Sequence, residues 1–289
     1  MSKRHDLDHH RYSLGEIREI MNAMKTLAYM ETRKLSRFIQ AQKAVVANIE
    51  SAAVDFMSFH GDTLPEVQTE ITVYLLIGTE RGFCGDINQA LASQFERVET
   101  HAVYGASASL IVIGRKLHQL FENDKRVAAY ISGANIAEEV SAVLEEVAQE
   151  LSILQRKHGT LTLYSIYHSG EDGIKMNMLL PPFKSLNHQQ VRYSDPPLLN
   201  IPPAEFFLEL TDAYVFAALN EMLYTSLIIE NRHRMTHLEG AVQHLDEEVI
   251  ELMRKSNVLR QEEITEEIEV ILLSTDSPNI REKTKKTYR

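Results

Sequence analysis

Residues 13–56 read "SLGEIREIMNAMKTLAYMETRKLSRFIQAQKAVVANIESAAVDF", and this stretch decides the fold. Alternating steps of three and four residues from Leu14 to Phe56 meet thirteen positions, eleven of them apolar. A repeat of 3.5 residues, kept for about six heptads without proline, is typical of a coiled-coil strand. The pattern therefore predicts a long helix that needs a partner along its whole length.

The ends of this helix are marked by local signals. Ser13 and Glu16 fit a capping box, which predicts a helix start at Ser13. Gly61 and Pro65 predict a stop. We therefore expect an N-terminal coiled-coil helix over residues 13–60.

A second long helix is expected near the other end of the chain. Residues 204–274 contain no proline and a single glycine, Gly240. The three-four spacing is kept by Leu238, Val242, Leu245, Val249, Leu252 and Leu259, with Ser256 where an apolar residue is due. Two such segments most simply pair antiparallel with each other, with the intervening chain inserted as a separate body.

Residues 68–200 have a different pattern. The runs "EITVYLLIG", "ASLIVIG" and "TLTLYSIYHS" are typical of strands, and helical patterns lie between them. Strands that alternate with helices predict a mostly parallel sheet. The expected fold is thus mixed α+β and α/β: a long antiparallel coiled coil of the terminal helices with an inserted Rossmann-like α/β domain. The proline-rich "LLPPF" and "DPPLLNIPP" are expected to be extended connectors back to the second helix.

Composition excludes several classes of protein. A net charge of −11 argues against nucleic-acid binding. No run approaches the roughly 18 apolar residues of a membrane span, and the start lacks the apolar core of a signal peptide. The single cysteine excludes an intramolecular disulfide and a multi-cysteine zinc site. We expect a soluble protein that is not exported, with a basic, disordered tail over residues 275–289.

The cysteine lies in "ERGFCGDINQAL", residues 80–91, directly after the first predicted strand. This is where α/β folds place ligand-binding loops, but the stretch has no dinucleotide, P-loop or nucleophile-elbow pattern. One interpretation is an enzyme with a Cys84 nucleophile. The favoured one is a tight turn, in which Gly82 and Gly85 set the backbone, Cys84 packs as a small apolar residue and Asp86 caps the next helix. Arg81 and Asn88 have no role in that turn.

Histidines offer a second possible site. His233 and His237 lie four residues apart with Glu230 three residues earlier, a spacing that can hold a metal, and "HDLDHH" near the start is similarly ambiguous. A solvated helix face is the favoured interpretation, and no metal or cofactor is expected.

Three separated stretches resemble the gamma subunit of rotary F-type ATP synthases. "ERGFCGDIN" resembles the R-G-x-C-G-x-x-N pattern of that family, and "LIVIGRKLHQLF" resembles its following strand and helix. "ENRHRM" and "SNVLRQEEITEEI" resemble its last helix, while "NAMKTLA" resembles the first only weakly.

The resemblance implies a central rotor shaft that performs no bond chemistry itself. It implies partners: three alpha and three beta subunits, an epsilon subunit and a membrane c-ring, at the cytoplasmic face of a bacterial inner membrane. It also implies beta-subunit contacts at Met24, Arg234, Arg260, Gln261, Thr265 and Glu267. The loop residues Arg81, Gly82, Cys84, Gly85 and Asn88 are implied either to contact epsilon or the ring, or to shape the turn.

Some positions depart from the family pattern. Val258 and Val270 stand where a lysine and a glutamate are usual, and Leu273 and Ser274 replace glycines. These departures favour a divergent or alternative F-type complex. Two rival functions stay open: an enzyme that uses the Cys84 loop, and a coiled-coil scaffold unrelated to ATPases. The sequence does not distinguish proton from sodium coupling, or synthesis from hydrolysis.

Overall fold

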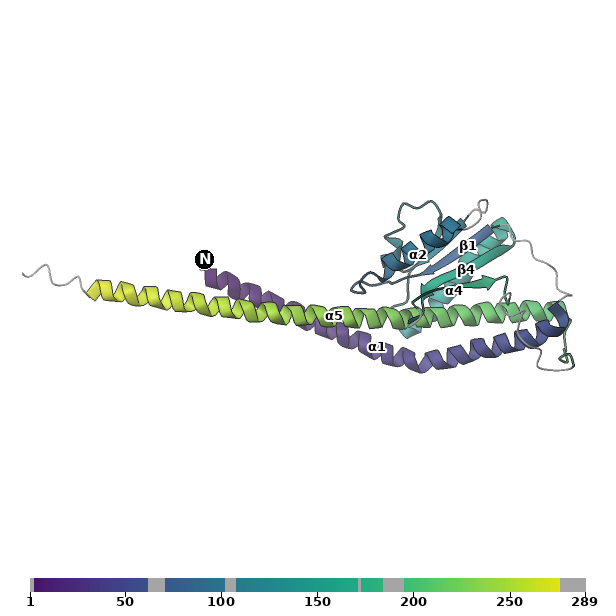
Figure 1. Cartoon of the computed structure of the whole chain (residues 1–289), viewed down its shortest axis with the longest axis horizontal. Helices are drawn as coiled ribbons and strands as arrows, with labels where there is room; N and C mark the ends of the chain where they lie inside the picture. The colour runs from purple at the N-terminus through teal and green to yellow at the C-terminus, as the bar shows by residue number, and fades with distance from the viewer. Residues whose placement is uncertain (1–2, 62–70, 102–107, 171–172, 184–194, 276–289) are drawn as a thin grey trace, which may run out of the picture. The chain divides into compact units, whose positions relative to one another are not determined.

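The computed structural model describes residues 3–61, 71–101, 108–170, 173–183 and 195–275. Two long helices lie near the ends of the chain, α1 (Lys3–His60) and α5 (Pro203–Thr275), and a five-stranded sheet with shorter helices lies between them in sequence (Figure 1). The described residues form two compact units. One combines the start of α1, to Lys25, with α5 from Leu238 onward, and the other holds residues 26–237.

In the first unit the two helices lie antiparallel. Three ion pairs join them in opposite sequence order: Arg4 with Glu263, Arg18 with Asp246, and Lys25 with Glu239. The apolar seam expected on α5 is present, because none of its positions is exposed. Leu238, Val242, Leu245 and Ser256 are buried, and Val249, Leu252 and Leu259 are half-buried.

The helix start predicted at Ser13 is wrong. Helix α1 begins at Lys3, so Ser13 and Glu16 lie inside it and no capping box forms. The extra turns pair with the far part of α5. Asp8 bonds with Arg4 and Arg11 on its own helix and accepts a hydrogen bond from Ser256. Contacts between the helices extend α1 beyond the local capping signal.

The second unit contains a sheet with strand order β3-β2-β1-β4-β5. The strands are β1 (Ile71–Ile77), β2 (Ala108–Ile113), β3 (Val127–Ile131), β4 (Leu161–His168) and β5 (Ile174–Leu180). Strands β1 to β4 pair in parallel, and β5 adds to β4 in antiparallel orientation. The mostly parallel sheet was predicted, whereas β3 and β5 were not. Leu179 and Leu180, which we expected in a connector, belong to β5.

Helices cover both faces of this sheet, as Figure 1 shows for α2 (Ile87–His101) and α4 (Val140–His158). One face packs on α2 and on the short α3 (Arg115–His118) around Tyr74, Leu91 and Phe95. The other face packs on α4, which follows a 3-10 turn (Ala137–Glu139), and on α1 and α5. We call β1–β5 with α2, α3, the 3-10 turn and α4 the α/β body.

The heptad pattern of α1 changes where the helix meets the α/β body. Leu35 and Phe56 are buried as the spacing predicts, but Phe38 and Val45 are exposed. The buried positions move one residue further, to Ile39, Val46 and Ala53. Leu35 and Ile39 share an apolar cluster with α5 and the sheet, so the helix turns its apolar face toward more than one neighbour.

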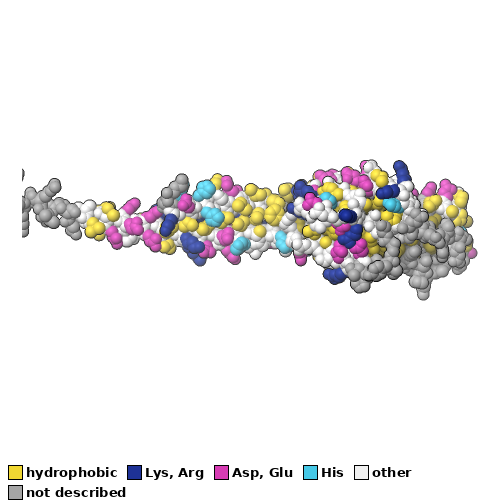
Figure 2. Space-filling model, turned by 90° about the horizontal axis from the view of Figure 1, so that it is seen from above, with side chains coloured by type: hydrophobic (Ala, Val, Ile, Leu, Met, Phe, Trp, Pro, Cys, Tyr) yellow, Lys and Arg dark blue, Asp and Glu magenta, His cyan; other side chains and the backbone are white. Residues whose placement is uncertain are grey.

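The remaining expectations concern the chain ends and the connectors. No helix in the described part of the chain is long and apolar enough to cross a membrane. The expected stop at Pro65 and the tail over residues 276–289 lie outside the described residues. The last turns of α5 expose a run of hydrophobic side chains (Figure 2), namely Val270, Ile271, Leu272 and Leu273.

Candidate functional site

The Cys84 loop, residues 78–86, connects the central strand β1 to α2. Strand β1 pairs in parallel with β2 on one side and with β4 on the other, so the loop leaves the sheet where the strand order reverses direction. This is the switch point at which α/β folds commonly bind ligands. Here the loop instead lies against a helix of the same chain, α5.

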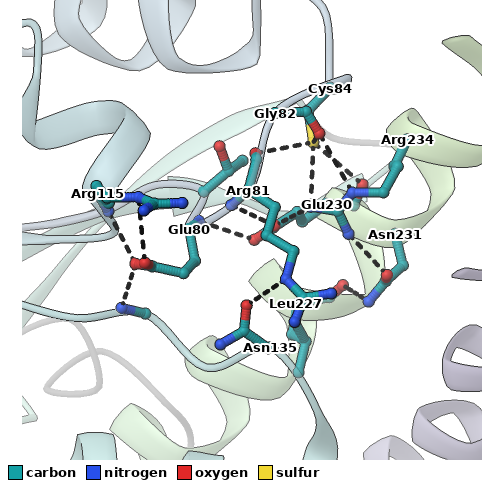
Figure 3. Close-up of polar contacts among 12 residues, drawn as sticks. Glu80, Arg81, Gly82, Cys84, Arg115, Asn135, Leu227, Glu230, Asn231 and Arg234 are labelled. Carbon is teal, nitrogen blue, oxygen red and sulfur yellow. Dashed lines mark hydrogen bonds and ion pairs between the residues drawn. The ribbon is translucent and has the colours of Figure 1, made fainter. Parts of the chain in front are cut away.

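Glu230 of α5 holds the backbone of this loop (Figure 3). Its carboxylate accepts hydrogen bonds from the amide N–H groups of Glu80 and Arg81, at 3.4 and 3.3 Å. The side chain is buried, with Glu230 only 5% exposed. Burial raises the pKa of the Glu230 carboxyl, and the Arg234 guanidinium and the two amides oppose that rise. A buried carboxylate with these partners is a structural anchor.

Arg234, one turn further along α5, completes the anchor. Its guanidinium pairs with Glu230, donates to the backbone carbonyl of Gly82 at 3.3 Å and lies 3.5 Å from the sulfur of Cys84. It also donates to the side-chain oxygen of Asn231 at 2.9 Å. Arg234 is 6% exposed. Removing one partner of such a buried pair typically costs about 3–5 kcal/mol.

Arg234 is one of the residues expected to contact a beta subunit. Its guanidinium is occupied inside the chain by Glu230, Gly82 and Cys84. All of these bonding partners of Arg234 belong to this chain. Within this chain, the guanidinium of Arg234 therefore serves to hold the Cys84 loop.

The side chain of Cys84 is the buried part of the loop. It is 3% exposed and belongs to the apolar cluster that includes β1 and α5. Its sulfur lies 3.3 Å from the carbonyl of Gly82 and 3.7 Å from that of Glu230, and its single proton can serve only one of them at a time. Burial raises the pKa of the Cys84 thiol to about 11. A thiol that stays protonated is a poor nucleophile, which disfavours the enzyme interpretation.

Of the two glycines expected to set the turn, only Gly85 is required by the backbone. Gly82 has no left-handed backbone, and a Cβ there meets only the tip of Lys116 at 3.8 Å, so this position does not require glycine. Phe83 takes the left-handed conformation instead, with φ 63°. Gly85 is required: its φ is +67° and an added Cβ would lie 2.1 Å from the ring of His237. The loop backbone thus touches α5 directly.

Side chains of the loop tie it to neighbouring strand ends. The Asn88 amide accepts from the Thr79 N–H at 3.0 Å and donates to the Thr79 hydroxyl at 2.8 Å. Arg81 donates to Asn135 at 2.6 Å. The Glu80 carboxylate accepts from the N–H groups of Arg115 and Gly133, at 2.9 and 2.8 Å (Figure 3). Arg81 and Asn88 therefore brace the loop.

Sequence reasoning missed Glu80 and Asn135, and it considered Glu230 only as a metal ligand. One available signal was the spacing of Glu230 and Arg234, four residues apart on a helix, which favours an ion pair. Within the described ranges, no group of three His, Cys, Asp or Glu side chains is placed to hold a metal. His233 lies 6.3 Å from the ring of His168, whose Nε2 is 2.9 Å from the carbonyl of Ile87.

The other expected contact residues lie on the long helices. Met24 is half-buried on α1. On α5 the side chains of Arg260, Gln261, Thr265 and Glu267 are all exposed, and the Thr265 hydroxyl donates to the carbonyl of Gln261 at 2.8 Å. These four residues are placed where a partner could reach them.

Fold and site together define a class of protein: a pair of long helices with an inserted α/β body, whose buried polar site fastens a loop to a helix. Comparison with known proteins identifies the family within this class. A family model described as ATP synthase matches residues 4–276, and the chain belongs to this family, as a gamma subunit.

Individual relatives agree with this assignment. The ATP synthase gamma chain of Saccharopolyspora erythraea is 24% identical, over 90% of this chain and 96% of that protein. The gamma chain of Clostridium botulinum is 22% identical, over 90% of this chain and 93% of its own length.

Two solved structures show a similar fold. One is from the mitochondrial ATP synthase central stalk and c-ring of Tetrahymena thermophila, with TM-score 0.54 and 16% identity over 77% of this chain and 99% of that one. The other is from the mitochondrial ATP synthase rotor of Euglena gracilis, with TM-score 0.57 and 13% identity over 90% and 98%.

Proposed function

We propose that this chain is the central rotor shaft of an F-type ATP synthase, and that it couples ion flow through a membrane ring to conformational cycling of catalytic beta subunits. The observation that carries the proposal is the family match along nearly the whole chain, residues 4–276. The two helices support it, since 58 and 73 residues are far longer than an ordinary globular domain needs.

A shaft of this kind must transmit torque without bending. Two helices packed side by side as a coiled coil resist bending and twisting better than one. The shaft also needs unequal faces, because each orientation has to favour a different conformation of the beta subunits. Rotation then shifts populations among these conformations. The subunit itself performs no bond chemistry in this proposal.

The proposed partners divide between the two parts of the chain. The helix pair would lie within a ring of three alpha and three beta subunits, with beta contacts at Met24, Arg234, Arg260, Gln261, Thr265 and Glu267. Arg260 suits this role because its planar guanidinium can bind a carboxylate at two points.

The Rossmann-like α/β body would contact the epsilon subunit and the c-ring at the cytoplasmic face of a bacterial membrane. The exposed side chain of Arg81 lies on the loop proposed for that contact. Beside it, Phe83 is an apolar side chain that is 52% exposed.

The departures at Val258, Val270, Leu273 and Ser274 support a divergent or alternative F-type complex. All four side chains are exposed, so they are available to partners that have changed with them. A fully active hybrid with alpha and beta subunits of an ordinary bacterial complex would contradict this part of the proposal.

The test of the main proposal is co-expression of the chain with F-type alpha and beta subunits from the same organism. We expect a stable complex whose shaft turns stepwise when ATP is added, observed with a gold rod attached to the α/β body. The proposal fails if the chain does not assemble with these subunits, or if ATP hydrolysis in the complex causes no rotation.

A further inference from the structure

We infer that Glu230 and Arg234 are positioning residues that fix the Cys84 loop to α5, and that torque between the α/β body and the shaft passes through this contact. The inference rests on the proposed rotor function and specifies where within the chain the force is carried. We call Glu230, Arg234 and the loop backbone they hold the joint.

The joint lies on a single face of α5. Glu230, Arg234 and His237 are spaced by four and three residues, which places them on one side of a helix. All three meet the loop. Glu230 bonds the N–H groups of Glu80 and Arg81, and Arg234 bonds the carbonyl of Gly82. The ring of His237 lies so close to Gly85 that a Cβ added there would be 2.1 Å from it. The contact therefore extends over two successive turns of the helix.

These contacts engage the loop backbone rather than mobile side chains. Apolar packing between α5 and the sheet, such as that of Leu223 and Leu227, is non-directional and tolerates small sliding movements. Hydrogen bonds and ion pairs weaken steeply when distance or angle changes. The joint is thus suited to resisting rotation of the α/β body about α5.

The loop passes force onward to the sheet. The Glu80 carboxylate bonds the backbone of Arg115, which follows β2, and of Gly133, which follows β3. The N–H of Lys116 donates to the carbonyl of Thr79 at 3.0 Å. The carboxyl ends of β1, β2 and β3 are consequently tied to the same short loop, and a load on the α/β body converges there.

Burial distinguishes the joint from other charged contacts of the second unit. The side chains of Glu230 and Arg234 are 6% and 7% exposed. In the pair between α1 and the 3-10 turn, the side chains of Lys34 and Glu138 are 37% and 60% exposed. Water can replace an exposed pair during movement at little cost, but it cannot reach a buried one. Of these two pairs, only the buried one can act as a fixed connection.

The experiment compares Glu230→Gln and Arg234→Met with wild type in the complex of this chain with its alpha and beta subunits. A rod on the α/β body reports its angular fluctuation while the shaft is held by the ring. The control is Arg126→Met, because Arg126 pairs with Asp124, Glu96 and Glu99, all within the α/β body.

We expect the angular variance to rise at least about twofold in both joint variants, as the buried connection is lost, and to stay unchanged in the control. ATP hydrolysis in the same complexes should change little, because the part of the shaft in the ring is intact. Unchanged variance in the joint variants would overturn the inference. A wild-type complex that fails to form or rotate would overturn the rotor function itself, and the inference with it.

If a joint variant does not assemble with the alpha and beta subunits, hydrogen exchange of the full-length chain tests the inference instead. With the joint lost, the amides of residues 80–86 should exchange at least about tenfold faster than in wild type, while those of β1 keep their protection. Equal exchange of the loop in Glu230→Gln and wild type would overturn the inference. So would equally faster exchange of β1, which would indicate general destabilisation.

Discussion

The hydroxyl of Ser256 on α5 donates a hydrogen bond of 3.0 Å to the carboxylate of Asp8 on α1. Ser256 stands where the repeat of α5 calls for an apolar residue, and it is buried at 7% exposure. The irregularity of the pattern thus corresponds to a polar layer. Such layers favour one register between helices, at some cost in stability.

Replacing Ser256 with leucine should therefore stabilise the helix pair. The substitution adds apolar burial worth up to about 1.5 kcal/mol and removes one hydrogen bond worth about 1 kcal/mol. Asp8 keeps its ion pairs with Arg4 and Arg11. We expect the free energy of unfolding to stay equal or rise by up to about 0.5 kcal/mol.

Thermal unfolding of the full chain, followed by circular dichroism, measures this change. Ser274→Ala serves as a control because Ser274 is exposed and bonds only the carbonyl of Ile271 on its own helix among the described contacts. A loss of stability above about 2 kcal/mol in Ser256→Leu would show that the seam has no room for the larger side chain.

The thiol of Cys84 should be unreactive in the folded chain. Its pKa of about 11 leaves few thiolates at pH 7.5, and the sulfur is buried. Alkylation by iodoacetamide should be more than about 100-fold slower than for a cysteine in a short peptide. Unfolding in urea should restore ordinary reactivity, and mass spectrometry of the chain measures both rates.

A related variant separates packing from chemistry. Cys84→Ala removes the thiol but keeps the backbone, so coupling in the assembled complex should be largely retained, with a loss of stability of about 1 kcal/mol. Rapid labelling of folded wild type, or loss of ATP-driven ion pumping in Cys84→Ala, would support a chemical role for the loop instead.

The seam of α5 could be predicted because its information is local. Spacing alone places Leu238, Val242 and Leu245 on one face, whatever covers that face. The same rule failed on α1 at Ile17, which is exposed, and again beyond Leu35, where burial moves from Phe38 to Ile39. There the helix packs on the α/β body as well as on α5, and periodicity contains no information about a second neighbour.

The joint could not be predicted from the sequence, for a related reason. Glu230 and the amides that it holds lie about 150 residues apart in the chain, so no sequence window contains both. The left-handed backbone of Phe83, rather than Gly82, was equally unpredictable, because such strain is supported by surrounding contacts. Resemblance to a family identified the correct loop, but only the structure shows what the loop binds.

The Asp124–Arg126 ion pair should make stability depend on pH. The Arg126 guanidinium lowers the pKa of Asp124 below its ordinary value near 3.8. For a carboxyl with a lowered pKa, the stabilisation is present above the unfolded pKa and is lost as the pH falls through the folded pKa. Asp124→Asn should therefore destabilise the chain by about 1–2 kcal/mol at pH 7 and by progressively less below pH 4.

Urea unfolding of wild type and Asp124→Asn at pH 7, 4 and 3 measures this difference. Asparagine retains one side-chain oxygen to accept the backbone N–H of Arg126 at 2.8 Å, but it replaces the oxygen that accepts from the guanidinium at 2.6 Å with an amide donor. The part of the difference that varies with pH therefore reports the charge. A difference between the two proteins that stays constant from pH 7 to pH 3 would show that the ion pair does not contribute.

Arg260 offers the sharpest test of the proposed beta-subunit contact. Its side chain is exposed on α5, so Arg260→Ala should change the free energy of unfolding by less than about 0.5 kcal/mol. In the complex, loss of a charge-assisted contact worth about 1.5–3 kcal/mol should slow ATP-driven rotation or weaken assembly about tenfold or more. Arg254→Ala is the matched control, since Arg254 is also exposed, six residues earlier on the same helix.

Rotation assays and native mass spectrometry measure the effects of Arg260→Ala on rotation and on assembly. If the assembled Arg260→Ala complex turns over as fast as wild type, Arg260 is a solvent-exposed residue of the shaft and the beta-subunit contact lies elsewhere.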